Sequence, residues 1–295
     1  MISDSDLKKV IEQVLIEMKY GDESKKAEEI VVQAINKGLA EDLNLPDVTT
    51  IDLRKDFHIE NPHNKDAYLK LKEATPARIG VGRCGSRYRT ETLIRFRADH
   101  AAAMDAVWND VSEEFLDKNN LFSIKTVIAN KDEFITRPDL GKIIDEDGIK
   151  TLKEKCKMKP RVQIYLADGL SSTAIETNGA DTLASISQGL KAYGIELGTP
   201  FFLKYGRVGS MDHISEILEP EVIAVLIGER PGLVTGESMS CYMTYKAYRG
   251  IPEAKRTVIS NIHKQGTPAA EAGAHIADII KKMLDEKASG LDLKL

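Results

Sequence analysis

The apolar run from Val222 to Ile227 constrains the fold of this chain more than any other stretch. It contains six consecutive apolar residues, most of them branched, with no polar interruption. A strand that is apolar on both faces must be covered on both faces, which is typical of a central strand in a parallel sheet. The run therefore predicts a buried β-strand with helices packed on either side.

Polar and turn-forming residues follow this run directly, in the segment Gly228-Glu229-Arg230-Pro231-Gly232. Pro231 cannot extend a strand ladder, and Gly232 permits backbone angles that are closed to other residues. In open α/β sheets ligands bind beyond the carboxyl ends of the strands, so Glu229 and Arg230 are candidate ligand contacts. The alternative is that these two side chains form an ion pair with each other at the end of the strand.

The second half of the chain, from residue 121 to residue 295, alternates strand-like and helix-like segments. This alternation predicts βαβ units, an α/β domain and a mostly parallel sheet flanked by helices. The expected strands are 124–129, 162–167, 201–208, 222–227, 240–245 and 258–262. The expected helices are 138–155, one capped by Ser171 to Thr173 and ending at Gly194, 211–218 and 269–288.

Two further regions precede the α/β domain. Residues 57–120 are expected to form a small helical domain with helices at 65–74 and 90–115. Residues 1–56 are expected to be an extension, with an amphipathic helix near residues 3–20 and a linker at 43–56. That helix is either a peptide that docks on another protein or a terminal helix folded back on the main body.

Composition excludes several classes of protein. The 41 basic and 46 acidic side chains give a net charge of −5, which argues against general nucleic-acid binding. The three cysteines lie far apart, so neither a disulfide scaffold nor a cysteine-rich zinc site is expected, and a reducing compartment is the natural location. No apolar run approaches the roughly 20 residues of a membrane span, and the acidic first residues predict no secretory signal.

The segment from residue 78 to residue 97 is rich in glycine and arginine. Gly80, Gly82 and Gly85 match the G-x-G-x-x-G spacing, but no buried strand precedes them, so a dinucleotide-binding turn is not expected. The arginines of the segment are Arg78, Arg83, Arg87, Arg89, Arg95 and Arg97. Guanidinium groups suit an acidic partner surface or a ligand phosphate, and the alternative is a solvated basic face.

No catalytic or metal-binding constellation is apparent in the sequence. Ser171, His263 and Asp168 could be imagined as a hydrolytic triad, but there is no G-x-S-x-G motif, and Ser171 is better explained as a helix cap. Cys241 has no neighbouring histidine and is expected to be a buried thiol. The six histidines show no metal-ligand spacing. The chain is therefore interpreted as a binding scaffold with polar loops at its strand ends.

Nine segments, taken together, resemble the small subunit of ethanolamine ammonia-lyase. In order they are ENPHNKDAYLKLKEATPARI, GRCGSRYRTETLIRFRADHA, FITRPDLG, DGLSSTAI, GTPFFLKYGRV, GERPGL, ESMSCYM, SNIHKQGTP and KKMLDEKASG. The resemblance runs from about Glu60 to Gly290, and its specificity comes from the shared order of many short segments. Residues 1–56 lie outside it, although this family also carries a variable N-terminal extension.

The resemblance implies one subunit of a carbon–nitrogen lyase that converts ethanolamine to acetaldehyde and ammonia with adenosylcobalamin. In that family the large subunit performs the radical chemistry in a barrel. The small subunit has a Rossmann-like α/β domain behind a small helical domain and closes over the cobalamin at the subunit interface. This chain is accordingly expected to form a hetero-oligomer with a large subunit and to have no activity alone.

The family's cobalamin contacts carry over to Val208, Glu229 and Val258 of this chain. Val258 departs from the family pattern, since a familiar relative has cysteine there. If that contact is apolar or uses the backbone, valine serves; if it needs sulfur, the assignment of Val258 fails. Glu229, as a carboxylate, could accept hydrogen bonds from the amide groups of the corrin or from the ribose of the nucleotide tail.

The N-terminal helix resembles the peptides that direct enzymes into bacterial microcompartments, so a shell partner and that location are expected. The arginine segment is interpreted as a contact with the large subunit or as another contact between subunits, with the solvated basic face still the alternative. The competing hypothesis is an independent α/β enzyme that acts on a phosphorylated or nucleotide substrate, with Asp168, Glu229 and His263 at the strand ends.

Overall fold

The computed structural model describes residues 48–294, and the chain divides into two compact units, residues 1–48 and residues 49–295. The description below concerns the second unit. The expected N-terminal helix and the beginning of the expected linker lie outside the described residues, so their structure and the proposed shell contact stay predictions.

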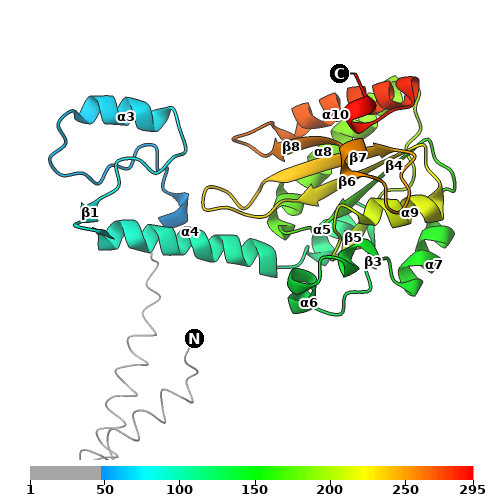
Figure 1. The fold of residues 1–295 in the computed structure, drawn as a ribbon, viewed down its shortest axis with the longest axis horizontal. Coiled ribbons are helices and arrows are strands. Elements are labelled where there is room, and N and C mark those ends of the chain that lie inside the picture. Colours follow the sequence, from blue (N-terminus) through cyan, green and yellow to red (C-terminus); the bar gives the residue numbers. More distant parts are fainter. Residues whose placement is uncertain (1–47, 295) are drawn as a thin grey trace, which may run out of the picture. The chain divides into compact units, whose positions relative to one another are not determined.

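A six-stranded sheet forms the centre of this unit, in the spatial order β3-β5-β4-β6-β7-β8 (Figure 1). Its strands are β3 (Phe122–Lys125), β4 (Val162–Ala167), β5 (Phe201–Lys204), β6 (Val222–Gly228), β7 (Met239–Tyr245) and β8 (Thr257–Ile262). The first four strands in this order are parallel, whereas β7 runs antiparallel to β6, and β8 antiparallel to β7. The predicted α/β class with a mostly parallel sheet is confirmed; the Rossmann-like classification stays a prediction.

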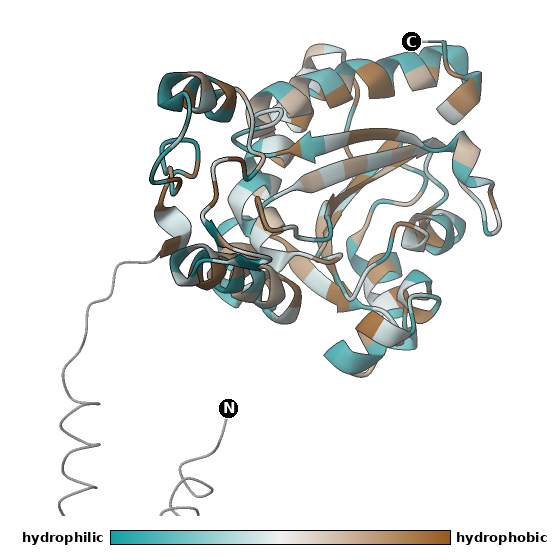
Figure 2. Cartoon of the chain, turned by 60° about the vertical axis from the view of Figure 1, so that its left-hand side comes forward, coloured by the Kyte–Doolittle hydropathy of each residue, from teal (hydrophilic) through white to brown (hydrophobic). Residues whose placement is uncertain are grey.

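Helices cover both faces of the sheet, as the apolar run of β6 predicts (Figure 1). On one face, α8 (Ser172–Ala192) and α10 (Ala269–Glu286) share a core with Val222, Ala224 and Leu226 of β6. On the other face, the residues between these in the strand pack with α7 (Glu146–Lys155) and α9 (Ser210–Leu218). Every residue of β6 is buried, and Figure 2 shows the central strands as predominantly apolar.

The region before β3 is mainly helical. It contains α3 (Lys65–Glu73), the short hairpin of β1 (Arg83–Cys84) and β2 (Arg87–Tyr88), α4 (Thr90–Trp108) and α5 (Glu113–Lys118). Gly85 lies in the hairpin turn with φ of 61°, so the glycine-rich segment is not the turn of a βαβ unit. The remaining elements are α6 (Lys131–Thr136) and the 3-10 turns η1 (Val48–Thr50), η2 (Leu140–Lys142), η3 (Glu253–Lys255) and η4 (Gly290–Asp292). The boundary expected at residue 120 stays a prediction.

Two predicted helices are wrong in extent, because polar caps interrupt them. The helix expected at 90–115 ends at Trp108, and Ser112 caps the separate helix α5 by accepting a hydrogen bond from the backbone N–H of Phe115. The helix expected at 138–155 begins only at Glu146, after Asp145 accepts the N–H of Gly148. An aspartate or serine at such a position satisfies an N–H that the first helical turn leaves unpaired.

Two predicted strands are also wrong in extent. The strand expected at 124–129 is β3, which ends at Lys125, and Thr126 forms only an isolated bridge with Ile144. The strand expected at 201–208 ends at Lys204, because Tyr205 adopts a left-handed conformation with φ of 60°. A left-handed residue turns the chain out of the sheet, so Val208 lies in a loop rather than in a strand.

Candidate ligand-binding site

The carboxyl ends of β4 and β6 meet at Gly169 and Gly228. These strands are parallel neighbours, and the N–H of Leu170 donates to the carbonyl oxygen of Gly228 at 2.9 Å. A Cβ atom on Gly169, whose φ is 55°, would lie 2.2 Å from that same carbonyl oxygen. A Cβ atom on Gly228 would lie 2.0 Å from the carbonyl oxygen of Ser171. Both positions therefore require glycine, and the close approach brings the two strand exits together.

An open pocket of about 380 Å³ lies beyond these strand ends, at the position where the sheet topology predicts a ligand. Two of the three residues expected to contact a cofactor, Val208 and Glu229, line its wall. The third, Val258, does not line the pocket, but it is the cross-strand partner of Tyr242, which does. The other residues of the wall are Gly169, Leu170, Arg207, Ile227, Gly228 and Arg230.

Two serines hold the Glu229 side chain: Ser240 of β7 and Ser238, which directly precedes that strand. The Ser240 hydroxyl donates to Oε1, and the Ser238 hydroxyl donates to Oε2 at 3.2 Å. The N–H of Glu229 also donates to the carbonyl oxygen of Ser238 at 3.0 Å, so the β6–β7 pairing continues past Gly228. The partners of the Glu229 carboxylate among residues 48–294 are these two serines and not Arg230, whose side chain is exposed. The expected Glu229–Arg230 ion pair is therefore wrong.

Tyr242 and Val258 extend the site across β7 and β8. Val258 is 44 % exposed, and Tyr242 is half-buried. Burial raises the pKa of the Tyr242 phenol, and the carboxylates of Glu229 and Glu253 raise it further. The phenol therefore stays protonated at neutral pH and can donate a hydrogen bond. The site thus combines a carboxylate acceptor, a phenol donor and an exposed apolar side chain.

Arg207 lies in the pocket wall and contacts Phe134 of α6. Its Nη2 donates to the carbonyl oxygen of Phe134 at 2.7 Å, and its guanidinium carbon lies 4.1 Å from the centre of the Phe134 ring. Burial lowers the pKa of Arg207, opposed by the charge of Asp168. Gly141 makes room for this side chain, because a Cβ there would lie 2.5 Å from the Cγ of Arg207.

Asp168 stands at the end of β4 but faces the protein interior. Its side chain accepts the backbone N–H groups of Gly169, Tyr205 and Gly206 at 2.9, 2.8 and 3.0 Å, and only 1 % of the residue is exposed. Burial raises the pKa of its carboxyl to about 6, against the opposing effect of those N–H groups and of Lys131. Asp168 does not line the pocket, so its carboxylate supports the β4 and β5 exits.

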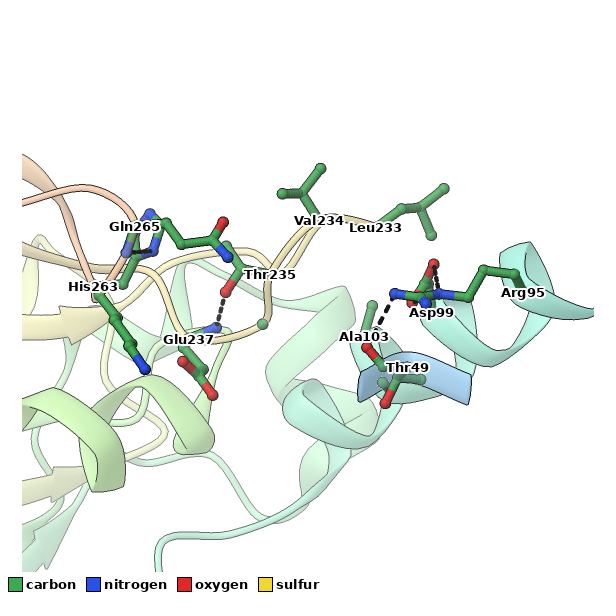
Figure 3. A pocket seen from close by; sticks show the side chains of 14 residues that line it. Thr49, Arg95, Asp99, Ala103, Leu233, Val234, Thr235, Glu237, His263 and Gln265 are labelled. Carbon is green, nitrogen blue, oxygen red and sulfur yellow. Dashed lines mark hydrogen bonds and ion pairs between the residues drawn. The ribbon is translucent and has the colours of Figure 1, made fainter. Parts of the chain in front are cut away.

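His263 lies at a different place from Glu229. Its Nε2 is 2.8 Å from the side-chain oxygen of Asn261, and its Nδ1 accepts the N–H of Gln265 at 3.3 Å. It lines a separate polar pocket of about 280 Å³, formed by α4, the β6–β7 loop and the β8–α10 loop (Figure 3). Asp168, Glu229 and His263, the residues of the competing enzyme hypothesis, are therefore not brought to one pocket.

The imagined triad and the cysteine behave as the sequence analysis expects. Ser171 accepts the N–H of Ala174 at 3.0 Å as the cap of α8, and its own hydroxyl donates to the carbonyl oxygen of Gly236 at 2.5 Å. Cys241 is fully buried in the sheet, and this burial raises the pKa of its thiol far above the ordinary value. Both roles are thus structural, and both predictions are confirmed.

The arginine segment divides into internal and exposed side chains. Arg78 and Arg95 both bind the buried Asp99 carboxylate, with the closest nitrogen–oxygen distances at 2.6 and 3.0 Å. Arg89 pairs with Glu60 at 2.6 Å. The other arginines have exposed side chains, and they are Arg83, Arg87 and Arg97. These three and Arg89, whose side chain is 41 % exposed in its pair with Glu60, are the arginines that can meet an acidic surface or a phosphate.

Sequence reasoning missed Asp99 and the polar face of β7. The spacing of Arg95 and Asp99, four residues apart on a helix, is a signal for the first. The alternation in ESMSCYM is a signal for the second, because positions 238, 240 and 242 face the pocket side while the intervening apolar residues enter the core. Within residues 48–294, no group of three or more histidine, cysteine, aspartate or glutamate side chains is arranged to hold a metal ion.

The fold and the pocket define a class of protein: an α/β protein with a pocket of polar and apolar side chains at the carboxyl ends of its parallel strands. Sequence comparison is consistent with this class. Residues 65–294 match the family model described as ethanolamine ammonia-lyase light chain (EutC).

Full-length relatives point to the same family. The chain is 57 % identical over 295 residues to the ethanolamine ammonia-lyase small subunit of Fusobacterium nucleatum subsp. nucleatum, covering 100 % of both chains. It is 55 % identical to that of Clostridium tetani, again over 100 % of both chains. It is 45 % identical to that of Listeria monocytogenes, covering 99 % of this chain and 100 % of the relative. The chain belongs to the family of ethanolamine ammonia-lyase small subunits.

Proposed function

We propose that this chain holds adenosylcobalamin against a large subunit in an ethanolamine ammonia-lyase complex that forms acetaldehyde and ammonia. The observation that carries this proposal is the gathering of Val208 and Glu229 on one pocket wall, with Val258 on the adjoining strand. Three segments distant in the sequence supply these residues. Val208 and Glu229 lie at the strand-end position that open α/β sheets use for ligands, and Val258 is linked to it through its cross-strand partner Tyr242.

The chemistry of the pocket fits the edge of a corrin ring, which carries amide side chains and methyl groups. Each carboxylate oxygen of Glu229 accepts one serine hydroxyl and keeps capacity for a second donor, such as an amide N–H. The phenol of Tyr242 can donate to an amide oxygen, and Val208 and Val258 offer apolar contact. An apolar role for Val258 agrees with valine, rather than cysteine, at this position.

The proposed role of the described pocket residues is to bind and orient the cofactor. Among the described residues of the pocket wall there is no pair of nucleophile and general base. When bound, adenosylcobalamin supplies a cobalt–carbon bond whose cleavage provides the radical chemistry. The chain's own contribution is to hold one side of the cofactor and to exclude water, while the large subunit supplies the substrate site.

The competing hypothesis of an independent enzyme finds less support in the geometry. Asp168 has its oxygens engaged by backbone N–H groups, and His263 has both ring nitrogens engaged in a different pocket. A phosphate or nucleotide would therefore meet neither residue together with Glu229.

Substitution of Glu229 by alanine tests the proposal. In the assembled complex, Glu229→Ala is expected to raise the dissociation constant for adenosylcobalamin about a hundredfold, because hydrogen bonds to a charged acceptor are lost. Absorption titration of the cofactor measures this constant. Glu237→Ala is the matched control, since Glu237 is an exposed carboxylate of the same loop outside this pocket. An unchanged constant for Glu229→Ala would remove the proposed site.

Location in a bacterial microcompartment is a separate proposal that rests on residues outside those described. The apolar stripe expected near residues 3–20 supports a shell-docking helix. Deletion of residues 1–20 is expected to leave activity of the complex intact and to abolish co-purification with shells. Shell association that survives the deletion would refute this role. Among the described residues no helix is both long and apolar enough to cross a membrane.

A further inference from the structure

We propose that Ser238 and Ser240 are positioning residues that fix the Glu229 carboxylate for hydrogen-bond donors on the ligand. This inference rests on the proposed function of the pocket. It assigns a role to Ser240 of β7 and to Ser238, which directly precedes that strand; neither lines the pocket wall itself.

The geometry places one hydroxyl on each carboxylate oxygen of Glu229. Ser240 donates to Oε1 and Ser238 to Oε2, so the plane of the carboxylate is fixed by two contacts rather than one. Ser240 is fully buried, whereas Glu229 is only half-buried and reaches the pocket. The two serines thus bind the carboxylate from the protein side, and its other side stays open to the pocket.

The register of the sheet makes this arrangement possible. Ser240 is the partner of Ile227, and the N–H of Glu229 bonds to Ser238, so the two serines and Glu229 lie on the same face of the β6–β7 pair. The intervening Met239 points to the opposite face and enters the core. The backbone alternation from residue 238 to residue 240 thus directs both serine side chains at Glu229.

The hydrogen-bond inventory indicates which ligand chemistry the site can take. An ionised carboxylate has about four acceptor positions, and the serines occupy two of them. The remaining positions can accept only donors, such as primary amide N–H groups or hydroxyls. A free glutamate side chain would lose its rotamer freedom when it binds such a donor, and the serines remove that loss by ordering it beforehand.

Thr244 provides a matched control on the same strand. It is fully buried on the same face of β7, but its hydroxyl has no hydrogen-bond partner among the described residues. Removal of this hydroxyl in Thr244→Val keeps the size of the side chain and does not touch Glu229. The control therefore separates the effect of losing a buried hydroxyl from the effect of losing a hydrogen bond to the Glu229 carboxylate.

The experiment titrates adenosylcobalamin into complexes of the large subunit with each variant and records absorption. Ser240→Ala is expected to raise the dissociation constant about tenfold, and Ser238→Ala, whose hydrogen bond is longer, about threefold. Thr244→Val is expected to leave the constant unchanged, and Ser240→Thr, which keeps the hydroxyl, to restore most of the lost affinity. Thermal unfolding of each variant chain is measured in parallel.

A second arm tests whether the serines act through Glu229. In the Glu229→Ala background, Ser240→Ala and Ser238→Ala are expected to cause no further loss, because there is no carboxylate left to position. Equal losses in both backgrounds would overturn the proposal and indicate a structural role. If Ser240→Ala fails to fold, Ser238→Ala, at a half-buried position, carries the same test.

The outcomes distinguish failure of the positioning role of the serines from failure of the proposed cofactor site. If Glu229→Ala weakens binding but both serine variants bind within twofold of wild type, the positioning role is wrong and the proposed function stands. If Glu229→Ala itself leaves the dissociation constant unchanged, the proposed site fails, and the positioning role fails with it.

Discussion

Two carboxylates stand at the ends of neighbouring parallel strands, Asp168 after β4 and Glu229 after β6, yet their surroundings differ in kind. Asp168 accepts three backbone N–H groups and is almost completely buried. Glu229 is held by two serine hydroxyls and stays half-buried at an open pocket. Backbone donors are fixed parts of the fold, so the Asp168 carboxylate has a structural role. The Glu229 carboxylate keeps the capacity to accept further hydrogen bonds from a ligand.

The comparison shows that a polar residue at a strand end is not by itself a ligand contact. The rule that ligands bind beyond the carboxyl ends of strands places both residues at the same edge. The identity of the hydrogen-bond partners then decides between support and recognition. Substitutions of Asp168 should accordingly affect mainly stability, and substitutions of Glu229 should affect mainly the proposed cofactor affinity.

Asp168→Ala is expected to have the largest effect on stability. It leaves three backbone N–H groups without an acceptor in the interior, and Tyr205 keeps a left-handed conformation without support, so the free energy of unfolding should fall by about 4 kcal/mol. Asp168→Asn is the matched variant: it can keep the two hydrogen bonds at Oδ1 and should lose about half as much. Urea unfolding of the chain measures both. A loss below about 1 kcal/mol for Asp168→Ala would contradict its structural role.

The pH dependence of stability should show the same carboxyl. Its pKa is raised by burial from 3.8 to about 6 in the folded chain, so the folded state binds the proton more tightly than the unfolded state. The stabilisation that proton binding to Asp168 gives the folded state is therefore fully present below pH 3.8, and it is lost as the pH rises through about 6. Between pH 7 and pH 4.5, wild type should gain about 2 kcal/mol relative to Asp168→Asn, which has no carboxyl at this position. Parallel curves for the two proteins would contradict this account of Asp168.

Val258 extends the comparison to the edge strand, where the proposed contact is an apolar side chain rather than a carboxylate. Val258→Ala removes two methyl groups from an exposed position and should raise the dissociation constant of the complex for adenosylcobalamin about fivefold. Val258→Cys should stay within about twofold of wild type, since the two side chains are of similar size. A large gain in affinity from cysteine would show that sulfur, rather than apolar contact, is needed there.

The smallest expected effect is that of Glu229 on folding. Glu229→Ala should lower the free energy of unfolding by only about 1 kcal/mol, because the half-buried carboxylate accepts two hydroxyls and only that of Ser240 is fully buried. Urea unfolding under the same conditions as for Asp168→Ala gives the direct contrast. If both substitutions destabilised the chain equally, the distinction between the two strand ends would be lost.

The sequence predicted much of this architecture because the responsible signals are local. The apolar run of β6 and the Ser171 cap of α8 each depend on residues close in the chain, and the structure has both. Errors arose where one residue ends an element, as Tyr205 does with its left-handed backbone after β5. Propensity patterns do not show such a conformation for a tyrosine.

The candidate site was predicted only in part, because its details depend on contacts between distant segments. The sequence pointed to Glu229 but not to its serine partners, whose role depends on the register between β6 and β7. It placed Asp168 at a strand end but could not show that the N–H groups of Tyr205 and Gly206, nearly forty residues later, occupy its oxygens. The hydrogen-bond partners of these two carboxylates are set by the tertiary structure and not by neighbouring residues in the sequence.

The most direct test of the central claim compares three samples in one adenosylcobalamin titration: the large subunit alone, this chain alone, and an equimolar mixture of the two. If this chain supplies one wall of the cofactor site, tight binding and ethanolamine deamination should appear only in the mixture, and Glu229→Ala should weaken the binding about a hundredfold. Equal affinity and full activity of the large subunit alone would contradict the account.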